Sequence, residues 1–302
     1  MAGLAEAYAW LRPDLVLLLG DRFEILAAAQ AALVLLIPVA HIAGGDTTEG
    51  AIDEAMRHAV SKMAHLHFVT NADSARRVRQ LGEDPAHVYA VGSPGIDAIR
   101  QVRLLPKAAL SAALGFELRA RNLLVTYHPA TLDGELNRPH CAALLDALEG
   151  LGGEVGLLFT HPNADAGGRE LSAMIDAFVA AHPNARSFRS LNRELYLSCM
   201  KICDAVVGNS SSGLYEAPSL GRPAVNIGDR QQGRLRAASV IDCAPEAKAI
   251  SQAIGKAWTL DCSGIENPYG DGRSAPRIVE RLASLPDYRA LLKKRFHDHA
   301  VS

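Results

Sequence analysis

Short apolar runs alternate with longer amphipathic stretches along the first third of the chain. The apolar runs predict strands, and the stretches between them have the spacing of helices. The predicted strands cover residues 15–19, 38–42, 66–70 and 87–91, and the predicted helices cover 22–36, 51–64 and 72–81. Each strand is a continuous apolar run, which is typical of parallel strands covered on both faces. The alternation therefore predicts an α/β fold with a parallel, doubly wound sheet.

The same pattern restarts after residue 122, which predicts a second α/β domain. Its strands cover 123–127, 155–160, 186–188, 204–207 and 224–227, and its helices cover 140–151, 168–181, 194–202 and 245–260. A mixed stretch at 95–107, with prolines near its ends, indicates a linker. We expect a first domain at 1–105, a second at 106–274 and a C-terminal helix from 275 to 302. Ligands of paired α/β domains bind outside the carboxyl ends of the strands, so polar residues there are the candidates.

The most informative segment is Gly-Asn-Ser-Ser-Ser-Gly at 208–213. It follows the apolar strand and precedes a predicted helix start at 214–217. Small residues at such a turn let a ligand approach the backbone, and the free amides and serine hydroxyls favour phosphate. Glu216, one turn into the helix, would repel phosphate but suits sugar hydroxyls. The segment predicts a site for a nucleotide with a diphosphate and a ribose; the alternative is a serine-capped helix.

Acidic side chains follow the first two predicted strands. Asp21 and Arg22 come directly after the first strand, where Arg22 suits a phosphate and Asp21 suits proton transfer. The alternative is that Asp21 caps the next helix. After the second strand, the loop and helix start carry the carboxylates Asp46, Glu49, Asp53 and Glu54. Asp46 and Asp53 are the best candidates for simple caps, whereas a carboxylate cluster beside a cleft can raise one pKa and create a base.

Two predicted strands of the second domain end in His-Pro, and a third ends in a basic loop. The prolines hold His128 and His161 extended, at the tips of their strands. Two such tips in one domain favour a ligand site over two turn histidines. The loop 226–234 offers Arg230 and Arg234 to an anion, unless it is a solvated surface loop.

Composition and missing motifs exclude several classes of function. The 302 residues are 49% hydrophobic and 21% charged, and a net charge of −2 gives no electrostatic case for nucleic acid or a membrane surface. No apolar run spans a membrane, and five scattered cysteines indicate a reducing cytoplasm. The absence of Gly-x-x-x-x-Gly-Lys and Gly-x-Gly-x-x-Gly argues against an ATPase or a dehydrogenase. His58, His65 and His67 lack a common zinc spacing, so we expect no metal.

Taken together, these segments resemble those of the hydrolysing UDP-N-acetylglucosamine 2-epimerases of sialic-acid and legionaminic-acid synthesis. The matching segments are 20–24, 41–67, 127–129, 162–167, 208–216, 226–234 and 269–272. They follow one another over nearly the whole chain, and they are specific as a set although each alone is weak. The resemblance implies a glycosyltransferase-B-like fold of two Rossmann-like domains, with a UDP-sugar between them and no cofactor.

The resemblance also implies a reaction and roles for single residues. The proton at sugar C2 is removed, UDP leaves by anti elimination, and water adds to release the free manno sugar. Asp21 and Asp53 would act as acid and base, and His128 would lie near the leaving diphosphate. The residues that would hold UDP are Arg22, Asn163, Ser210, Ser211, Glu216 and Arg230. We expect a cytoplasmic homo-oligomer that acts on UDP-N-acetylglucosamine or on UDP-2,4-diacetamido-2,4,6-trideoxyglucose, without a nucleic-acid or membrane partner.

Two departures from the family pattern keep alternatives open. Many relatives have a catalytic Glu where this chain has Ala43, so Asp46 or Glu49 is expected to replace it. The opening strand and nucleotide-contacting turn of family members also have no counterpart here, which predicts a late start codon or a fragment with little activity of its own. The alternatives are a non-hydrolysing 2-epimerase and a truncated remnant that binds UDP without turnover.

Overall fold

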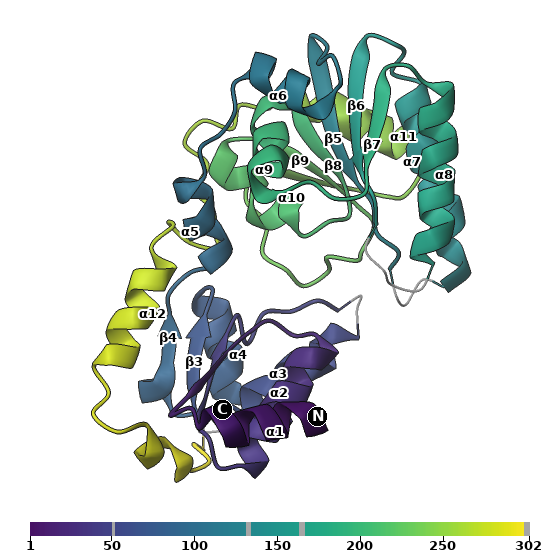
Figure 1. The fold of residues 1–302 in the computed structure, drawn as a ribbon. Helices are drawn as coiled ribbons and strands as arrows, with labels where there is room; N and C mark the ends of the chain where they lie inside the picture. The colour runs from purple at the N-terminus through teal and green to yellow at the C-terminus, as the bar shows by residue number, and fades with distance from the viewer. Residues whose placement is uncertain (50–51, 131–133, 163–166, 299–302) are drawn as a thin grey trace. The chain divides into compact units, whose positions relative to one another are not determined.

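The computed structural model describes residues 1–49, 52–130, 134–162 and 167–298 (Figure 1). The chain forms two compact units, which are Met1–Asp97 with Tyr269–Ser302, and Ala98–Pro268. These divisions differ from the expected boundaries at 105 and 274. The C-terminal segment is part of unit 1 because Ile278 and Leu282 pack on Leu66 and Phe68 of its core.

Unit 1 contains a parallel sheet of four strands in the order β1-β2-β3-β4. The strands are β1 (Val16–Leu19), β2 (Val39–Ile42), β3 (Leu66–Val69) and β4 (Val88–Ala90). The helices are α1 (Ala2–Leu11), α2 (Phe23–Val34), α3 (Asp53–Met63), α4 (Ala72–Gln80), α12 (Ser274–Ala283) and the 3-10 turns η1 (Pro85–His87) and η4 (Tyr288–Leu292). Helix α5 (Pro94–Gln101) carries the division between the units. The helix α1 was not predicted from the sequence.

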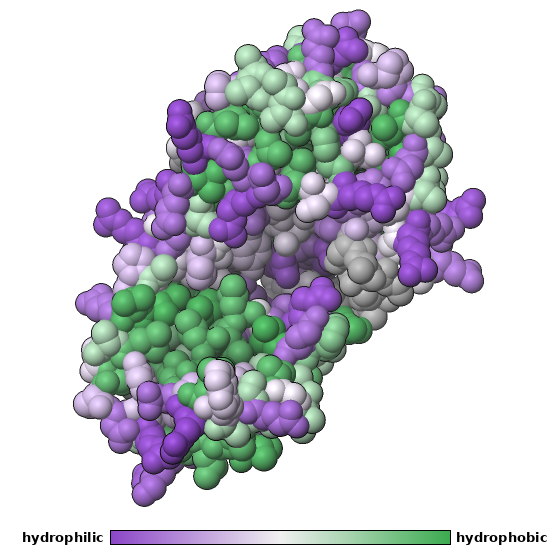
Figure 2. All heavy atoms as spheres, viewed as in Figure 1, coloured by the Kyte–Doolittle hydropathy of each residue, from purple (hydrophilic) through white to green (hydrophobic). Residues whose placement is uncertain are grey.

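The strands of unit 1 are not equally covered. Strands β2 and β3 are buried along their whole length, as their continuous apolar runs predict. Strand β1, which lies at the edge of the sheet, alternates instead, because the face that carries Leu17 and Leu19 is uncovered and leaves them 47% and 56% exposed. Leu36 is also exposed, and Figure 2 shows that hydrophobic side chains gather on the viewed face of unit 1.

Unit 2 contains a parallel sheet of six strands in the order β10-β9-β8-β5-β6-β7. The strands are β5 (Arg121–Thr126), β6 (Val155–Thr160), β7 (Ala185–Phe188), β8 (Ala205–Gly208), β9 (Ala224–Ile227) and β10 (Val240–Cys243). The helices are α6 (Lys107–Leu114), α7 (Asn137–Glu149), α8 (Gly168–Ala181), α9 (Arg193–Ile202), α10 (Ser212–Tyr215), α11 (Ala247–Ala257) and the 3-10 turns η2 (Gly134–Leu136) and η3 (Ala217–Leu220). The predicted parallel α/β architecture is confirmed in both units, whereas β10 was not predicted.

The strand register of unit 2 aligns the ends of four strands. Thr126 of β5 pairs with Thr160 of β6 and with Gly208 of β8, and Gly208 pairs with Asn226 of β9. Leu123, Val125 and Val207 lie just behind these residues in the buried core. The segments that follow the four strands therefore leave the sheet side by side, at the edge where ligands of such sheets bind.

Neither a spanning helix nor a disulfide is found in the part of the chain that the structure describes. None of its helices has the length and apolar character needed to cross a membrane. The five cysteines are free thiols, and all except Cys243 are buried.

A buried carboxylate holds the C-terminal segment against the rest of unit 1. The side chain of Glu83 is 2% exposed and accepts hydrogen bonds from Lys62 at 2.8 Å and from His67 at 3.0 Å. Lys294 forms an ion pair with the same carboxylate at 2.6 Å and also donates to the carbonyl oxygens of Lys62 and Ala64. Burial by itself raises the pKa of Glu83, but the three hydrogen-bond donors outweigh it and lower the pKa to about 2.

We expect this cluster to make unit 1 sensitive to acid. Because the folded pKa of Glu83 lies below its ordinary value of 4.5, its contribution to stability is present above pH 4.5 and is lost as the pH falls towards 2. Chemical denaturation should show a Glu83→Gln protein less stable than wild type by about 3 kcal/mol at pH 7, with the difference shrinking in acid. A Glu280→Gln protein, altered at an exposed site on α12, is the control and should match wild type.

Candidate functional site

The serine motif leaves β8 through a backbone conformation that requires glycine. Gly208 has φ of +138°, and a Cβ atom there would collide with the carbonyl oxygen of Thr126. Gly213 packs closely on Ala224, whose Cβ would lie 3.3 Å from an added Cβ. The helix α10 that follows begins at Ser212, two residues before the predicted start at 214, and has a single turn that continues as η3. The helix dipole is correspondingly small here, and hydroxyls, amides and nearby cations must supply most of any anion binding.

Asn209 joins three strand ends of unit 2 into one cluster. Its side chain accepts a hydrogen bond from the amide of His128 and donates one to the carbonyl of His128, both at 2.7 Å. Its carbonyl accepts from Arg230 at 3.2 Å and from Gln231 at 2.8 Å. The predicted residues His128, Ser210 and Arg230 are therefore brought together. The sequence analysis missed Asn209 and Gln231 because both act through backbone groups of distant segments.

The three serines of the motif have different surroundings. The hydroxyl of Ser212 is buried and lies 2.6 Å from the hydroxyl of Tyr196 and 3.1 Å from that of Ser210. Ser210 and Ser211 are half-buried, and Ser211 caps α10 without a side-chain hydrogen bond. Ser212 thus fixes the turn, while Ser210 and Ser211 remain the serines placed to meet a ligand.

In unit 2, the carboxylate of Glu216 gives the clearest indication of a ligand that donates hydrogen bonds. Its Oε2 atom is buried and finds no hydrogen-bond donor among the residues that the structure describes. Burial raises the pKa of Glu216 to about 7, although Arg193 and Arg234 act to lower it. A buried acceptor without a partner costs stability, so this site favours a ligand that brings hydroxyl donors.

In unit 1, Arg57 organises the acidic residues that the sequence singled out. Its side chain is 2% exposed and holds Asp21 in an ion pair, with Nε 3.0 Å from Oδ2. It also donates to Glu54 at 2.6 Å, to the hydroxyl of Thr48 at 2.9 Å and to the carbonyl of Asp46 at 2.8 Å. Asp21 is 25% exposed, so the carboxylate is held on one side and open on another. The sequence analysis missed Arg57, whose only local signal is its place one turn after Asp53 on α3.

The predicted capping roles of the acidic residues are wrong. Arg22, not Asp21, occupies the N-cap of α2, and Asp53 is the first residue of α3, after the N-cap Ile52. Asp46 is buried, and it is not the N-cap residue of any helix that the structure describes. Its Oδ1 instead accepts hydrogen bonds from Thr70 at 2.5 Å and Ser74 at 2.6 Å.

Glu54, one of the carboxylates of this acidic segment, does not have the raised pKa expected for a base. Burial acts to raise the pKa of Glu54, but hydrogen bonds from Thr48 and His58 and the charge of Arg57 lower it overall. Of the two expected replacements for Ala43, Asp46 already accepts hydrogen bonds from Thr70 and Ser74, and Glu49 is exposed.

Two of the remaining candidates, Arg22 and His161, lie near acidic side chains of their own. Arg22 is exposed, with its Nε 3.5 Å from Glu24, and His161 forms an ion pair with Asp176 at 3.2 Å. Asn163 lies outside the described residues. The histidines that lack a zinc spacing have separate partners, which are Glu54 for His58, the amide of Val39 for His65 and Glu83 for His67. Within the described ranges, no group of three or more His, Cys, Asp or Glu side chains is arranged to hold a metal ion.

Comparison with known proteins gives a consistent result. Residues 1–283 match the protein family described as UDP-N-acetylglucosamine 2-epimerase. The chain is 40% identical over 256 residues to the GDP/UDP-N,N'-diacetylbacillosamine 2-epimerase (hydrolyzing) of Campylobacter jejuni, an alignment that covers 84% of this chain and 66% of that protein. It is 34% identical over 294 residues to the UDP-N,N'-diacetylbacillosamine 2-epimerase (hydrolyzing) of Legionella pneumophila, covering 97% of this chain and 77% of that protein. The chain thus spans only part of the length of these relatives.

Solved structures show the same fold at lower sequence identity. The UDP-GlcNAc 2-epimerase of Neisseria meningitidis bound to UDP-GlcNAc has a TM-score of 0.81 at 23% identity, covering 94% of this chain and 80% of that chain. The UDP-GlcNAc 2-epimerase of Methanocaldococcus jannaschii in complex with UDP-GlcNAc and UDP has a TM-score of 0.80 at 17% identity, covering 93% and 79%. These likenesses confirm the expected glycosyltransferase-B-like fold.

The buried carboxylate of Glu216 predicts an unusual dependence of stability on pH. Its folded pKa of about 7 exceeds the ordinary value of 4.5, so the ligand-free protein should lose stability as the pH rises from 4.5 to 7. At pH 8, Glu216→Gln should raise the free energy of unfolding by about 2–3 kcal/mol, whereas at pH 4 the two proteins should be equal. Denaturation at both pH values checks this. Equal stability at pH 8 would show that Glu216 has a partner that offsets its burial.

Proposed function

This chain belongs to the UDP-N-acetylglucosamine 2-epimerase family, and from that premise we propose that it is a hydrolysing 2-epimerase of a UDP-N-acetylated sugar. Unit 2 holds the UDP, and the acidic residues of unit 1 carry out proton transfer. The observation that carries the proposal is the serine motif with Glu216, because it combines a phosphate cradle with a buried acceptor that lacks a hydroxyl donor among the described residues.

The nucleotide contacts follow from the chemistry of each group. Ser210 and Ser211 offer hydroxyls to the diphosphate, and Arg230, next to the same turn, offers a guanidinium. We assign His128, whose backbone amide donates a hydrogen bond to the side chain of Asn209, to the leaving diphosphate. Glu216 accepts from the ribose hydroxyls, which satisfy its buried oxygen. Asn163 and Arg22 are assigned to UDP from the family resemblance alone.

We assign the acid–base roles in the chemical step to Asp21 and Asp53. A base takes the proton from C2 of the sugar, a double bond forms between C1 and C2, and the C1–O bond breaks so that UDP leaves with the electron pair. Water then adds its oxygen to C1, and a proton returns to C2 on the opposite face, which gives the free 2-epimer. Arg57 keeps Asp21 in place by holding Oδ2, while Asp53 lies one turn before Arg57 on α3. No cofactor enters this sequence of steps.

The sugar that we propose is a 2,4-diacetamido-2,4,6-trideoxyhexose. The relatives from Campylobacter jejuni and Legionella pneumophila are both named for UDP-N,N'-diacetylbacillosamine, and both are named as hydrolysing enzymes. A Neisseria meningitidis relative named UDP-N-acetylglucosamine 2-epimerase is 31% identical, so UDP-N-acetylglucosamine is the competing substrate. We further propose that the enzyme works in the cytoplasm as a homo-oligomer.

The test supplies each UDP-sugar and follows UDP release together with the stereochemistry of the sugar by NMR. We expect UDP and the free manno-configured diacetamido sugar to accumulate in equal amounts. Asp21→Asn should lower turnover by about 10²–10⁴ with UDP affinity nearly unchanged, because it removes a proton-transfer group but no UDP contact. Asp14→Asn, an exposed change in the segment before β1, is the matched control. Return of an epimerised UDP-sugar would identify a non-hydrolysing enzyme, and UDP binding without release would refute turnover.

The role of Arg230 is tested separately by UDP binding. A charge-assisted phosphate contact contributes about 1.5–3 kcal/mol, so Arg230→Ala should weaken UDP binding at least about tenfold. Isothermal titration calorimetry with UDP measures the change. Lys256→Ala removes an exposed cation from the last turn of α11 and should leave the affinity unaltered. Unchanged affinity in Arg230→Ala would remove this residue from the site.

A further inference from the structure

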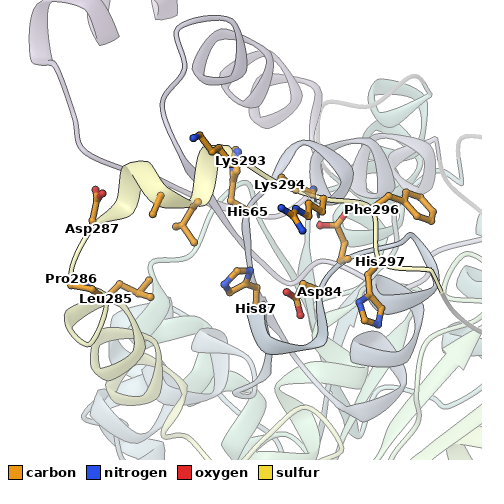
Figure 3. Close-up of a pocket in the computed structure, with 14 residues that line it drawn as sticks. His65, Asp84, His87, Leu285, Pro286, Asp287, Lys293, Lys294, Phe296 and His297 are labelled. Atoms are coloured by element: carbon orange, nitrogen blue, oxygen red, sulfur yellow. Dashed lines mark ion pairs between the residues drawn. The ribbon is translucent and has the colours of Figure 1, made fainter.

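A cavity lies in unit 1, lined by residues other than those of the candidate site described above. Its volume is about 560 Å³ (Figure 3). His65 directly precedes β3 and His87 directly precedes β4, so the cavity lies at the amino ends of these parallel strands. The other wall is the C-terminal segment from Leu285 to His297. In Figure 3, Asp287 lies at one end, His65 and His87 lie in the middle and Phe296 lies at the other end.

Two of the three cationic side chains that line the cavity are available to a ligand. Lys293 and Arg295 are exposed, and neither side chain forms an ion pair or hydrogen bond within the ranges that the structure describes. The three acidic residues of the lining already have hydrogen-bond donors, although those of Asp84 and Asp287 are backbone amides and leave the carboxylate charge in place. Glu83 is held by Lys62, Lys294 and His67, Asp84 accepts from the amide of Ala86, and Asp287 accepts from the amide of Arg289. An anion that enters would therefore meet two cations with unused donors.

His65 adds a directed neutral donor. Its Nδ1 accepts a hydrogen bond from the amide of Val39 at 3.1 Å, which places the ring proton on Nε2. Burial and the charge of Lys294 lower the pKa of His65 to about 4, so the ring stays neutral and keeps this arrangement at physiological pH. His87 and His297 bring two further imidazoles to the lining.

We propose that this cavity binds a small phosphorylated molecule. The planar fork of Arg295, the ammonium of Lys293 and the N–H of His65 are the donor types that phosphate oxygens recruit. The volume falls within the range of small-molecule sites, which is about 300–1,000 Å³. Leu285, Leu291 and the exposed ring of Phe296 offer apolar surface to the rest of the ligand. This site is separate from the serine motif, and the proposal does not depend on the proposed reaction.

The test titrates pyrophosphate into the full chain by isothermal titration calorimetry. We expect binding that weakens at least tenfold in the Lys293→Ala/Arg295→Ala double variant. Arg289→Ala removes an exposed cation of the same segment that does not line the cavity, and it should stay within twofold of wild type. The three proteins are also compared in an Arg230→Ala background, so that binding at the serine motif cannot mask the loss. Circular dichroism establishes that each variant is folded.

Each outcome decides the proposal. A loss confined to the double variant, in both backgrounds, supports a phosphate site in this cavity. Equal binding by the double variant and wild type would overturn it, and so would absence of pyrophosphate binding in the Arg230→Ala background. A titration with citrate distinguishes the anion type, because tighter binding of citrate than of pyrophosphate would overturn the assignment to phosphate.

Discussion

The constraint on which this structure depends is the double coverage of its parallel strands. Strands β2, β3, β6, β8 and β9 are buried along their whole length, so the polar side chains within them, such as His67 and Asn226, do not reach solvent. The polar side chains that can meet a ligand therefore lie mainly on the segments that leave the sheets. The strand register then places these segments next to one another, as the pairing of Thr126, Gly208 and Asn226 illustrates. A ligand site at the strand ends follows from burial and register together.

A few buried polar groups hold in place the segments that follow the strands. Arg57 ties the segment after β1 to the acidic loop, and Asn209 ties the segment after β5 to those after β8 and β9. Each of these groups satisfies several backbone or charged partners at once, and loss of one partner would leave the others buried without compensation. The same logic explains Glu83, which fastens the C-terminal segment to unit 1 at the opposite end of the strands.

Glu216 differs from these groups because its surroundings leave it incomplete. A buried oxygen without a donor destabilises the ligand-free fold, and the raised pKa expresses that cost. Ribose hydroxyls would remove the cost on binding, so part of the affinity for a nucleotide would come from relief of an unfavourable state. Stability without ligand and affinity for ligand are thus opposed at one residue, which is a common feature of functional sites.

The sequence by itself determined the parallel α/β architecture, the serine motif and the strand-end positions of Asp21, His128 and Arg230, because apolar periodicity and turn chemistry are local. Only the tertiary structure decided what these residues touch. Arg57 reaches Asp21 across 36 positions, and Asn209 reaches His128 across 81. It also decided that the C-terminal helix completes unit 1 and that β1 keeps one face uncovered. Such partners depend on how distant segments pack, and no local pattern of residues encodes that.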